Sequence, residues 1–119
     1  MPVLPADEAK FEIGVDVVVI GAGACGLTAA LAASEAGAAV LVLERDARPT
    51  GSTSLSTGLI PAAGTRLQKS MGIEDSPELL ANDILSKARH QTDAAIVRMV
   101  AKASGPTIDW LADEHGVAF

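Results

Sequence analysis

The stretch from Asp16 to Glu44 reads DVVVIGAGACGLTAALAASEAGAAVLVLE, and it decides the fold. The run from Ile13 to Ile20 is β-branched and nearly continuous, which is typical of a parallel strand buried on both faces. An alanine-rich segment, residues 27–36, favours a helix that ends at Gly37, and a second apolar run covers residues 39–43. Strand, glycine turn, helix and strand in this order predict a right-handed βαβ crossover, so the expected fold class is α/β.

The glycine turn of this unit has the pattern Gly-x-Gly-x-x-Gly. Its residues are Gly21, Ala22, Gly23, Ala24, Cys25 and Gly26. The pattern is weak evidence alone, but here a strand precedes it, a helix follows it and an acid ends the next strand, which is the context of a dinucleotide site. We expect Gly21 to permit the tight turn, Gly23 to let the backbone approach a pyrophosphate, and Gly26 to let the helix pack on the strand. The first-turn amides and the helix dipole would then face the phosphates.

Glu44 and Arg45 follow the second strand and are assigned to the same nucleotide site. Glu44 lies 18 positions after Gly26, which suits a carboxylate that binds both ribose hydroxyls. A carboxylate there would repel a 2′-phosphate, which disfavours NADP. The turn by itself does not separate NAD from FAD.

Composition narrows the classes of function. The chain has 119 residues, 49% of them hydrophobic and 20% charged, with a net charge of −6, as in an ordinary globular domain. Only 3% of the residues are aromatic, and with the acidic balance this argues against nucleic-acid binding. No run approaches the ~20 apolar residues of a membrane span, and no secretion signal is recognisable. We therefore expect a soluble protein without membrane contact. Cys25 is the single cysteine, which excludes disulfides within the chain and zinc clusters and favours a reducing, cytoplasmic setting, and we assign no residue to a metal site.

We expect three parts along the chain. Residues 1–12 form a flexible tail, residues 13–65 form the nucleotide-binding βαβ unit with a second loop, and residues 66–119 form a helical segment. Within that segment Ser76 and Pro77 open one helix, and Thr92 or Asp93 caps a second. A third, short helix is expected after the run of residues 104–106, and residues 117–119 resemble the start of a strand.

The second loop, from Thr50 to Thr65, reads TGSTSLSTGLIPAAGT. It resembles the second flavin-contacting loop of the fumarate reductase and succinate dehydrogenase flavoprotein family, whose pattern is Gly-Gly-Asn/Ser-Thr, a few small residues, Gly-Gly, an apolar residue and Ala-Ala-Gly-Thr. The resemblance covers residues 14–119 and implies a Rossmann-like βαβ unit that binds FAD. The loop residues expected to contact this cofactor are Gly51, Ser52, Thr53, Ser56, Thr57 and Gly58.

Three residues depart from the family pattern. Thr50 stands where the family often has its first glycine, and Leu59 replaces the second glycine of the later pair. Ser52 falls where membrane-bound succinate dehydrogenases carry a histidine linked covalently to the flavin. A serine cannot form that link, so we expect FAD to be held non-covalently.

The resemblance implies an oxidoreductase that moves hydride between FAD and a carbon–carbon bond of a small-molecule substrate. The arginines that hold such substrates belong to family segments that would follow residue 119, so no residue of this chain is assigned to catalysis. We therefore expect an amino-terminal fragment, incomplete relative to the family fold and inactive alone. Its open sheet edge and apolar surface would favour association.

Two alternatives stay open. The chain could be the Rossmann domain of an NAD-dependent dehydrogenase in which residues 50–65 are only a loop. It could also be a stand-alone nucleotide-binding module without catalysis.

Overall fold

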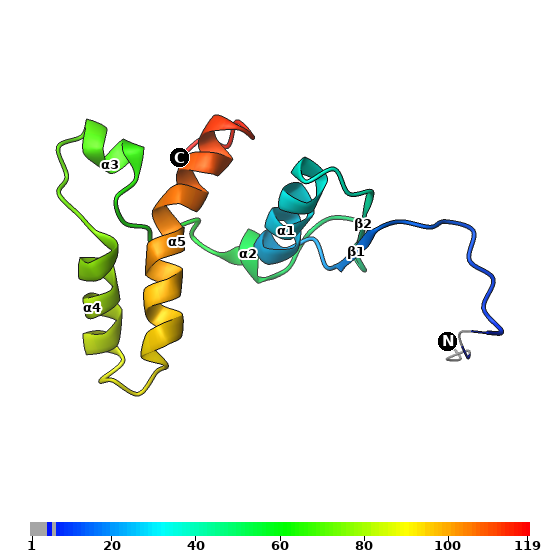
Figure 1. Ribbon diagram of the computed structural model, residues 1–119, viewed down its shortest axis with the longest axis horizontal. Helices are drawn as coiled ribbons and strands as arrows, with labels where there is room; N and C mark the ends of the chain where they lie inside the picture. The colour runs from blue at the N-terminus through cyan, green and yellow to red at the C-terminus, as the bar shows by residue number, and fades with distance from the viewer. Residues whose placement is uncertain (1–4, 6) are drawn as a thin grey trace. The chain divides into compact units, whose positions relative to one another are not determined.

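The computed structural model describes residue 5 and residues 7–119 of the chain (Figure 1). Of the expected tail, residues 5 and 7–12 are described and form no helix or strand, while residues 1–4 and 6 lie outside the described residues. The chain divides into two compact units, one ending at Leu59 and the other running from Ile60 to Phe119. The sequence places this boundary after residue 65. The contacts group residues 60–65 with the helices because Ala63 lies against Gly105 of the last helix.

The first unit is the expected parallel βαβ unit followed by one short helix. Its elements are β1 (Val17–Ile20), α1 (Ala24–Glu35), β2 (Val40–Leu43) and α2 (Ser52–Leu55). The two strands pair in parallel, with Val17 beside Val40 and Ile20 beside Leu43. The turn of α2 inside the second loop is not expected from the sequence.

The end of α1 shows why the crossover is tight. Gly37 has a φ of 86°, and its N–H donates to the Ser34 carbonyl at 2.9 Å. The next N–H, of Ala38, donates to the Ala33 carbonyl at 3.1 Å, which completes a Schellman motif. The expected helix stop at Gly37 is therefore confirmed, whereas α1 begins at Ala24, three residues earlier than expected.

The expectation that the strands are buried on both faces is wrong for this structure. Val18 is 52% exposed and Ile20 is 86% exposed, while Val17 and Val19, which alternate with them, are partly buried. Successive strand side chains point to opposite faces, and α1 packs on only one face of the pair. The other face is apolar and uncovered within the described residues.

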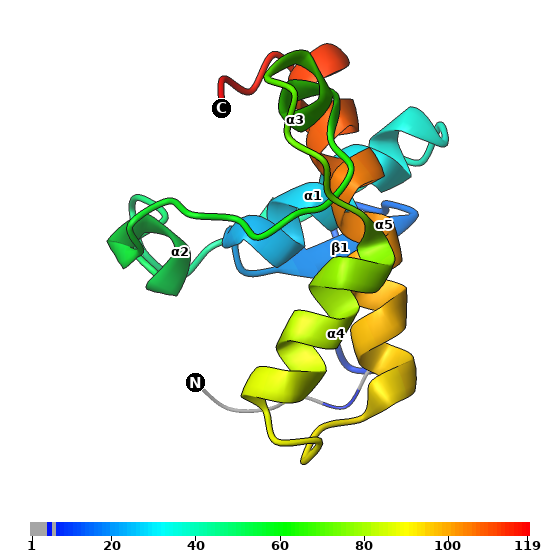
Figure 2. The same ribbon diagram turned by 90° about the vertical axis from the view of Figure 1, so that its left-hand side faces the viewer.

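The second unit is helical. It contains α3 (Arg66–Ser70), α4 (Pro77–Lys87) and α5 (Ala94–Asp113), and α4 and α5 lie side by side (Figures 1 and 2). Their shared core consists of Ala81, Leu85, Val97 and Ala101.

The helix starts agree with the sequence signals. The Ser76 hydroxyl accepts a hydrogen bond from the Leu79 N–H at 3.2 Å, so it caps α4 as expected. Of the two residues proposed to cap the next helix, Asp93 does so by accepting from the amides of Ala95 and Ile96.

The expected break between two helices at residues 104–106 is wrong, because α5 runs unbroken through these positions. The Ser104 hydroxyl donates to the Ala101 carbonyl at 2.8 Å and accepts from the Ala63 N–H at 3.3 Å. A Cβ on Gly105 would lie 2.2 Å from the Ala63 carbonyl oxygen. The glycine therefore serves close packing of the backbone and does not end a helix.

The expected strand at residues 117–119 is not formed either. The Val117 N–H donates to the Leu111 carbonyl at 3.0 Å, which holds this segment against the end of α5. In the part of the chain that the structure describes, no helix has both the length and the apolar character needed to cross a bilayer.

Candidate functional site

The glycine turn between β1 and α1 has the backbone that its sequence predicts. Gly21 has a φ of 101°, a conformation that side chains disfavour. A Cβ on Gly26 would lie 2.0 Å from the Gly21 carbonyl oxygen and 3.1 Å from Cγ1 of Val19. Gly21 thus permits the turn, and Gly26 lets the start of α1 pack directly on the end of β1.

Three backbone N–H groups of this turn have no acceptor within the part of the chain that the structure describes. Among the described residues, 5 and 7–119, the amides of Gly23, Cys25 and Gly26 make no hydrogen bond. They stand at the start of the 12-residue helix α1, where the helix dipole adds partial positive charge. Unpaired amides at a helix N-terminus form a binding site for phosphate oxygens. The turn therefore fits the pyrophosphate of a dinucleotide.

Glu44 follows β2, and its carboxylate lies against the glycine turn. Its Oε2 accepts from the Ala22 N–H at 2.9 Å, and its Oε1 accepts from the Asp46 N–H at 3.1 Å. The Ala22 amide and then the Asp46 amide hold the pKa of Glu44 below its ordinary value, so the group is ionised at neutral pH. Each oxygen of a carboxylate accepts about two bonds, which leaves capacity for ribose hydroxyls.

The side chain of Arg45 pairs with Asp46, at 3.2 Å between Nε and Oδ1. This pairing raises the pKa of Arg45 and lowers the pKa of Asp46, which also accepts from the Thr50 hydroxyl at 3.1 Å. The structure thus brings Glu44 to the turn and directs the guanidinium of Arg45 to Asp46. Asp46 is absent from the residues predicted for the site, although an acid two positions after Glu44 was a visible signal.

The second loop reaches the glycine turn through one side chain, that of Thr53. Its Oγ1 accepts from the Ala24 N–H at 3.1 Å, and a Cβ built on Gly23 would lie 3.6 Å from the same oxygen. Gly51 is the N-cap residue of α2. The structure therefore joins the two glycine-rich loops at the start of α1.

The other loop residues expected at the site lie in the surface of the same loop. The Ser56 hydroxyl donates to the Thr53 carbonyl at 2.9 Å and accepts from the Gly58 N–H at 3.1 Å, and Gly58 has a φ of 79°. Ser52 and Thr57 are exposed. These residues shape the loop, and within the described residues none of their side chains bonds to the glycine turn.

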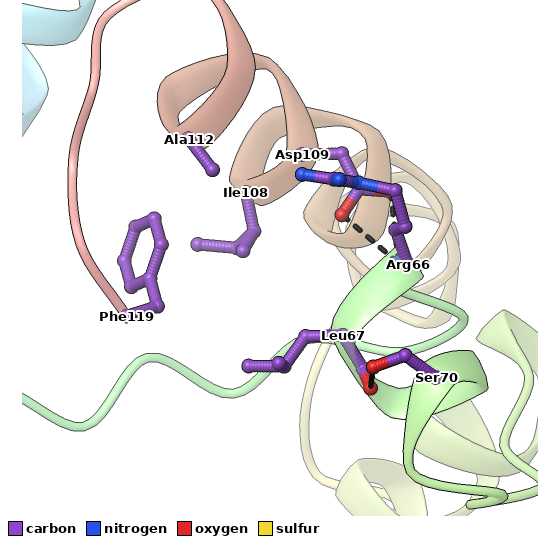
Figure 3. A pocket seen from close by; sticks show the side chains of 7 residues that line it. All are labelled: Arg66, Leu67, Ser70, Ile108, Asp109, Ala112 and Phe119. Atoms are coloured by element: carbon purple, nitrogen blue, oxygen red, sulfur yellow. Dashed lines mark hydrogen bonds between the residues drawn. The ribbon is translucent and has the colours of Figure 1, made fainter.

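A separate hollow of about 230 Å³ lies in the second unit (Figure 3). It is lined by Arg66, Leu67, Ser70, Ile108, Asp109, Ala112 and Phe119. The Arg66 N–H donates to both Asp109 oxygens, at 3.0 and 3.1 Å, and its guanidinium pairs with Asp113. These polar groups tie α3 to α5, so we read them as structural and assign the hollow no ligand.

Residues 16–119 match the family described as FAD binding domain. The chain belongs to this family. It is 40% identical over 105 residues to the urocanate reductase of Eggerthella lenta, covering 88% of this chain and 17% of that protein. It is 37% identical over 97 residues to a fumarate reductase (cytochrome) of Shewanella frigidimarina, covering 82% of this chain and 17% of that protein.

Two solved structures are similar in fold. One is the open conformation of a flavocytochrome c3 fumarate reductase, with a TM-score of 0.74 and 35% identity over 82% of this chain and 17% of that one. The other is the 3-ketosteroid-Δ4-(5α)-dehydrogenase of Rhodococcus jostii RHA1, with a TM-score of 0.76 and 34% identity over 89% and 22%. The resemblance to fumarate reductase-type flavoproteins is therefore confirmed, and the chain spans less than a quarter of the length of these relatives.

Proposed function

We propose that this chain binds the ADP part of FAD at the glycine turn and holds the cofactor non-covalently. The observation that carries the proposal is the set of three amides at the start of α1 that bond to nothing among the described residues, together with an ionised Glu44, in a member of the FAD binding domain family. Phosphate oxygens fit the amides, and the ribose hydroxyls fit the carboxylate.

Each part of the site has a role in this proposal. The amides of Gly23, Cys25 and Gly26 hold the pyrophosphate, while Gly21 and Ala22 shape the turn around it. Glu44 binds the adenosine ribose, and Arg45 borders the same site. Residues 13–65 form the cofactor-binding part in this proposal. The second loop would contact the rest of the cofactor through backbone amides and hydroxyls of Gly51, Ser52, Thr53, Ser56, Thr57 and Gly58.

The absence of a covalent link follows from the chemistry of Ser52. A serine hydroxyl is not nucleophilic enough at neutral pH to take the place of the imidazole that forms the link in succinate dehydrogenases. Denaturing the protein should therefore release FAD as the free, chemically unchanged cofactor.

For the whole protein we propose a flavin-dependent oxidoreductase that reduces or oxidises a carbon–carbon bond in a small molecule. The named relatives, a fumarate reductase and a urocanate reductase, support this class of substrate. When bound, FAD supplies the hydride acceptor or donor of that reaction. The residues of this chain bind and orient the cofactor, and we assign none of them to the chemical step.

The test is the absorption spectrum of the purified intact protein, followed by acid precipitation. The proposal predicts a yellow protein with a flavin spectrum, and free FAD in the supernatant after precipitation. Flavin that stays with the precipitate would contradict non-covalent binding. A colourless protein that binds NAD would support a dehydrogenase instead, and equal affinity for ADP and FAD without reductase activity would support a binding module.

A further inference from the structure

Helix α1 begins without a capping side chain of its own. Its N-cap residue is Gly23, which has no side-chain acceptor, and the first turn contains no acidic residue. Helices usually satisfy a first-turn amide with a Ser, Thr, Asp or Asn at the N-cap position. In this chain α3, α4 and α5 follow that rule with Thr65, Ser76 and Asp93. Helix α1 departs from the rule, as does the single turn of α2, whose N-cap residue is Gly51.

The missing cap comes from the second loop. Thr53 lies 29 positions beyond Ala24, and its Oγ1 accepts the Ala24 N–H at 3.1 Å. The neighbouring hydroxyl of α2, on Ser54, instead donates to the Gly51 carbonyl at 2.9 Å, inside its own turn. Thr53 therefore makes the hydrogen bond that joins the second loop to the start of α1.

The geometry leaves the hydrogen of this hydroxyl available. The oxygen accepts from Ala24, and within the described part of the chain the Thr53 hydroxyl donates to no other group. A threonine hydroxyl has one donor hydrogen beside its acceptor lone pairs. The hydrogen bond from the Ala24 N–H thus fixes the oxygen at the start of α1, while the hydroxyl hydrogen can still be donated to an anion.

We propose that Thr53 is a positioning residue: it caps α1 from the second loop and holds the two loops in one cofactor-binding arrangement before the cofactor arrives. The inference rests on the proposed FAD site, which it deepens. A site ordered in advance loses less conformational entropy on binding, so the cap strengthens FAD binding beyond the contact that the hydroxyl itself makes.

The experiment compares Thr53→Val, Thr53→Ser and Ser54→Ala in the intact protein. Valine keeps the size and branching of threonine but cannot accept a hydrogen bond, and serine keeps the hydroxyl. Ser54→Ala removes a hydroxyl that donates to the carbonyl of Gly51, the N-cap residue of the same helix. Hydrogen exchange in the absence of flavin is followed in residues 22–27 and 51–58, and FAD affinity is measured by titration.

Thr53→Val is expected to raise the hydrogen-exchange rate in both segments about fivefold, the factor that corresponds to the loss of a typical side-chain cap. The dissociation constant for FAD should rise at least about fivefold. Thr53→Ser should restore both, and Ser54→Ala should leave residues 22–27 unchanged. If residues 22–27 exchange at the wild-type rate in Thr53→Val, the hydroxyl does not cap α1. If their exchange rate changes but FAD affinity does not, the cap has no link to cofactor binding. A wild-type protein that binds no FAD would refute the proposed function, while the exchange result would still decide the cap.

Discussion

Replacing Gly26 with alanine tests how closely the start of α1 packs on β1. The new Cβ would lie 2.0 Å from the Gly21 carbonyl oxygen, and real Cβ atoms essentially never come within 3.0 Å of another heavy atom. The two backbone segments must therefore separate by at least 1.0 Å, a shift that no side-chain rotation can supply. Overpacking of this kind costs about 1–3 kcal/mol, and the better helix propensity of alanine offsets at most about 1 kcal/mol of it.

The expected result is a loss of roughly 1–2 kcal/mol in the free energy of unfolding, measured by urea titration. Because the same shift displaces the unpaired amides at the start of α1, FAD affinity should fall at least about tenfold. Gly14→Ala is the matched control, since a Cβ there has no heavy atom within 4 Å. If Gly26→Ala unfolds and binds FAD as Gly14→Ala does, the start of α1 does not depend on this close backbone contact.

Three further changes have defined outcomes. Because the Ala22 amide lowers the pKa of Glu44 in the folded state, the stabilising effect of the carboxylate is present at neutral pH and is lost as the pH falls through that lowered pKa. Urea titrations between about pH 7 and pH 3 should then show a smaller loss of stability in Glu44→Gln than in the wild type, and equal losses would contradict this. Arg89 follows α4 at the position that Gly37 occupies after α1, and its φ of 50° is strained for a residue with a side chain. Arg89→Gly should therefore raise the free energy of unfolding by about 1 kcal/mol in the same assay. A loss of stability would show that the arginine makes a compensating contact. Pro106 lies inside α5 and has no N–H to donate to the helix. Pro106→Ala should therefore raise the free energy of unfolding by up to about 3 kcal/mol. No gain would mean that α5 accommodates the proline without a cost in stability.

The parts of the fold that could be predicted are those that depend on neighbours in sequence. The βαβ order follows from two apolar runs and an alanine-rich segment, and the helix stop at Gly37 follows from its freedom to adopt a positive φ. Ser76 and Asp93 could be recognised as caps because each acts on amides two or three positions away.

The parts that could not be predicted depend on contacts between distant residues. Gly105 indicates a helix break in the sequence, but in the structure it allows close packing against Ala63, more than 40 positions earlier in the chain. The hydrogen bond of the neighbouring Ser104 to Ala63 spans 41 positions. The capping of Ala24 by Thr53 spans 29 positions and leaves no local pattern. The sequence placed both residues in the cofactor site and gave no sign that they bond to each other.

Binding of FAD at the glycine turn is best tested with Gly23→Ala in the intact protein. A Cβ at this position would meet only the Thr53 hydroxyl, at an ordinary contact distance of 3.6 Å, so the fold should tolerate the change. We expect the variant to unfold in urea as the wild type does. Its FAD affinity, measured by calorimetric titration, should fall at least about a hundredfold, because the methyl group would occupy the space of the pyrophosphate. Wild-type FAD affinity in a stably folded Gly23→Ala protein would show that the glycine turn is not the site of the pyrophosphate.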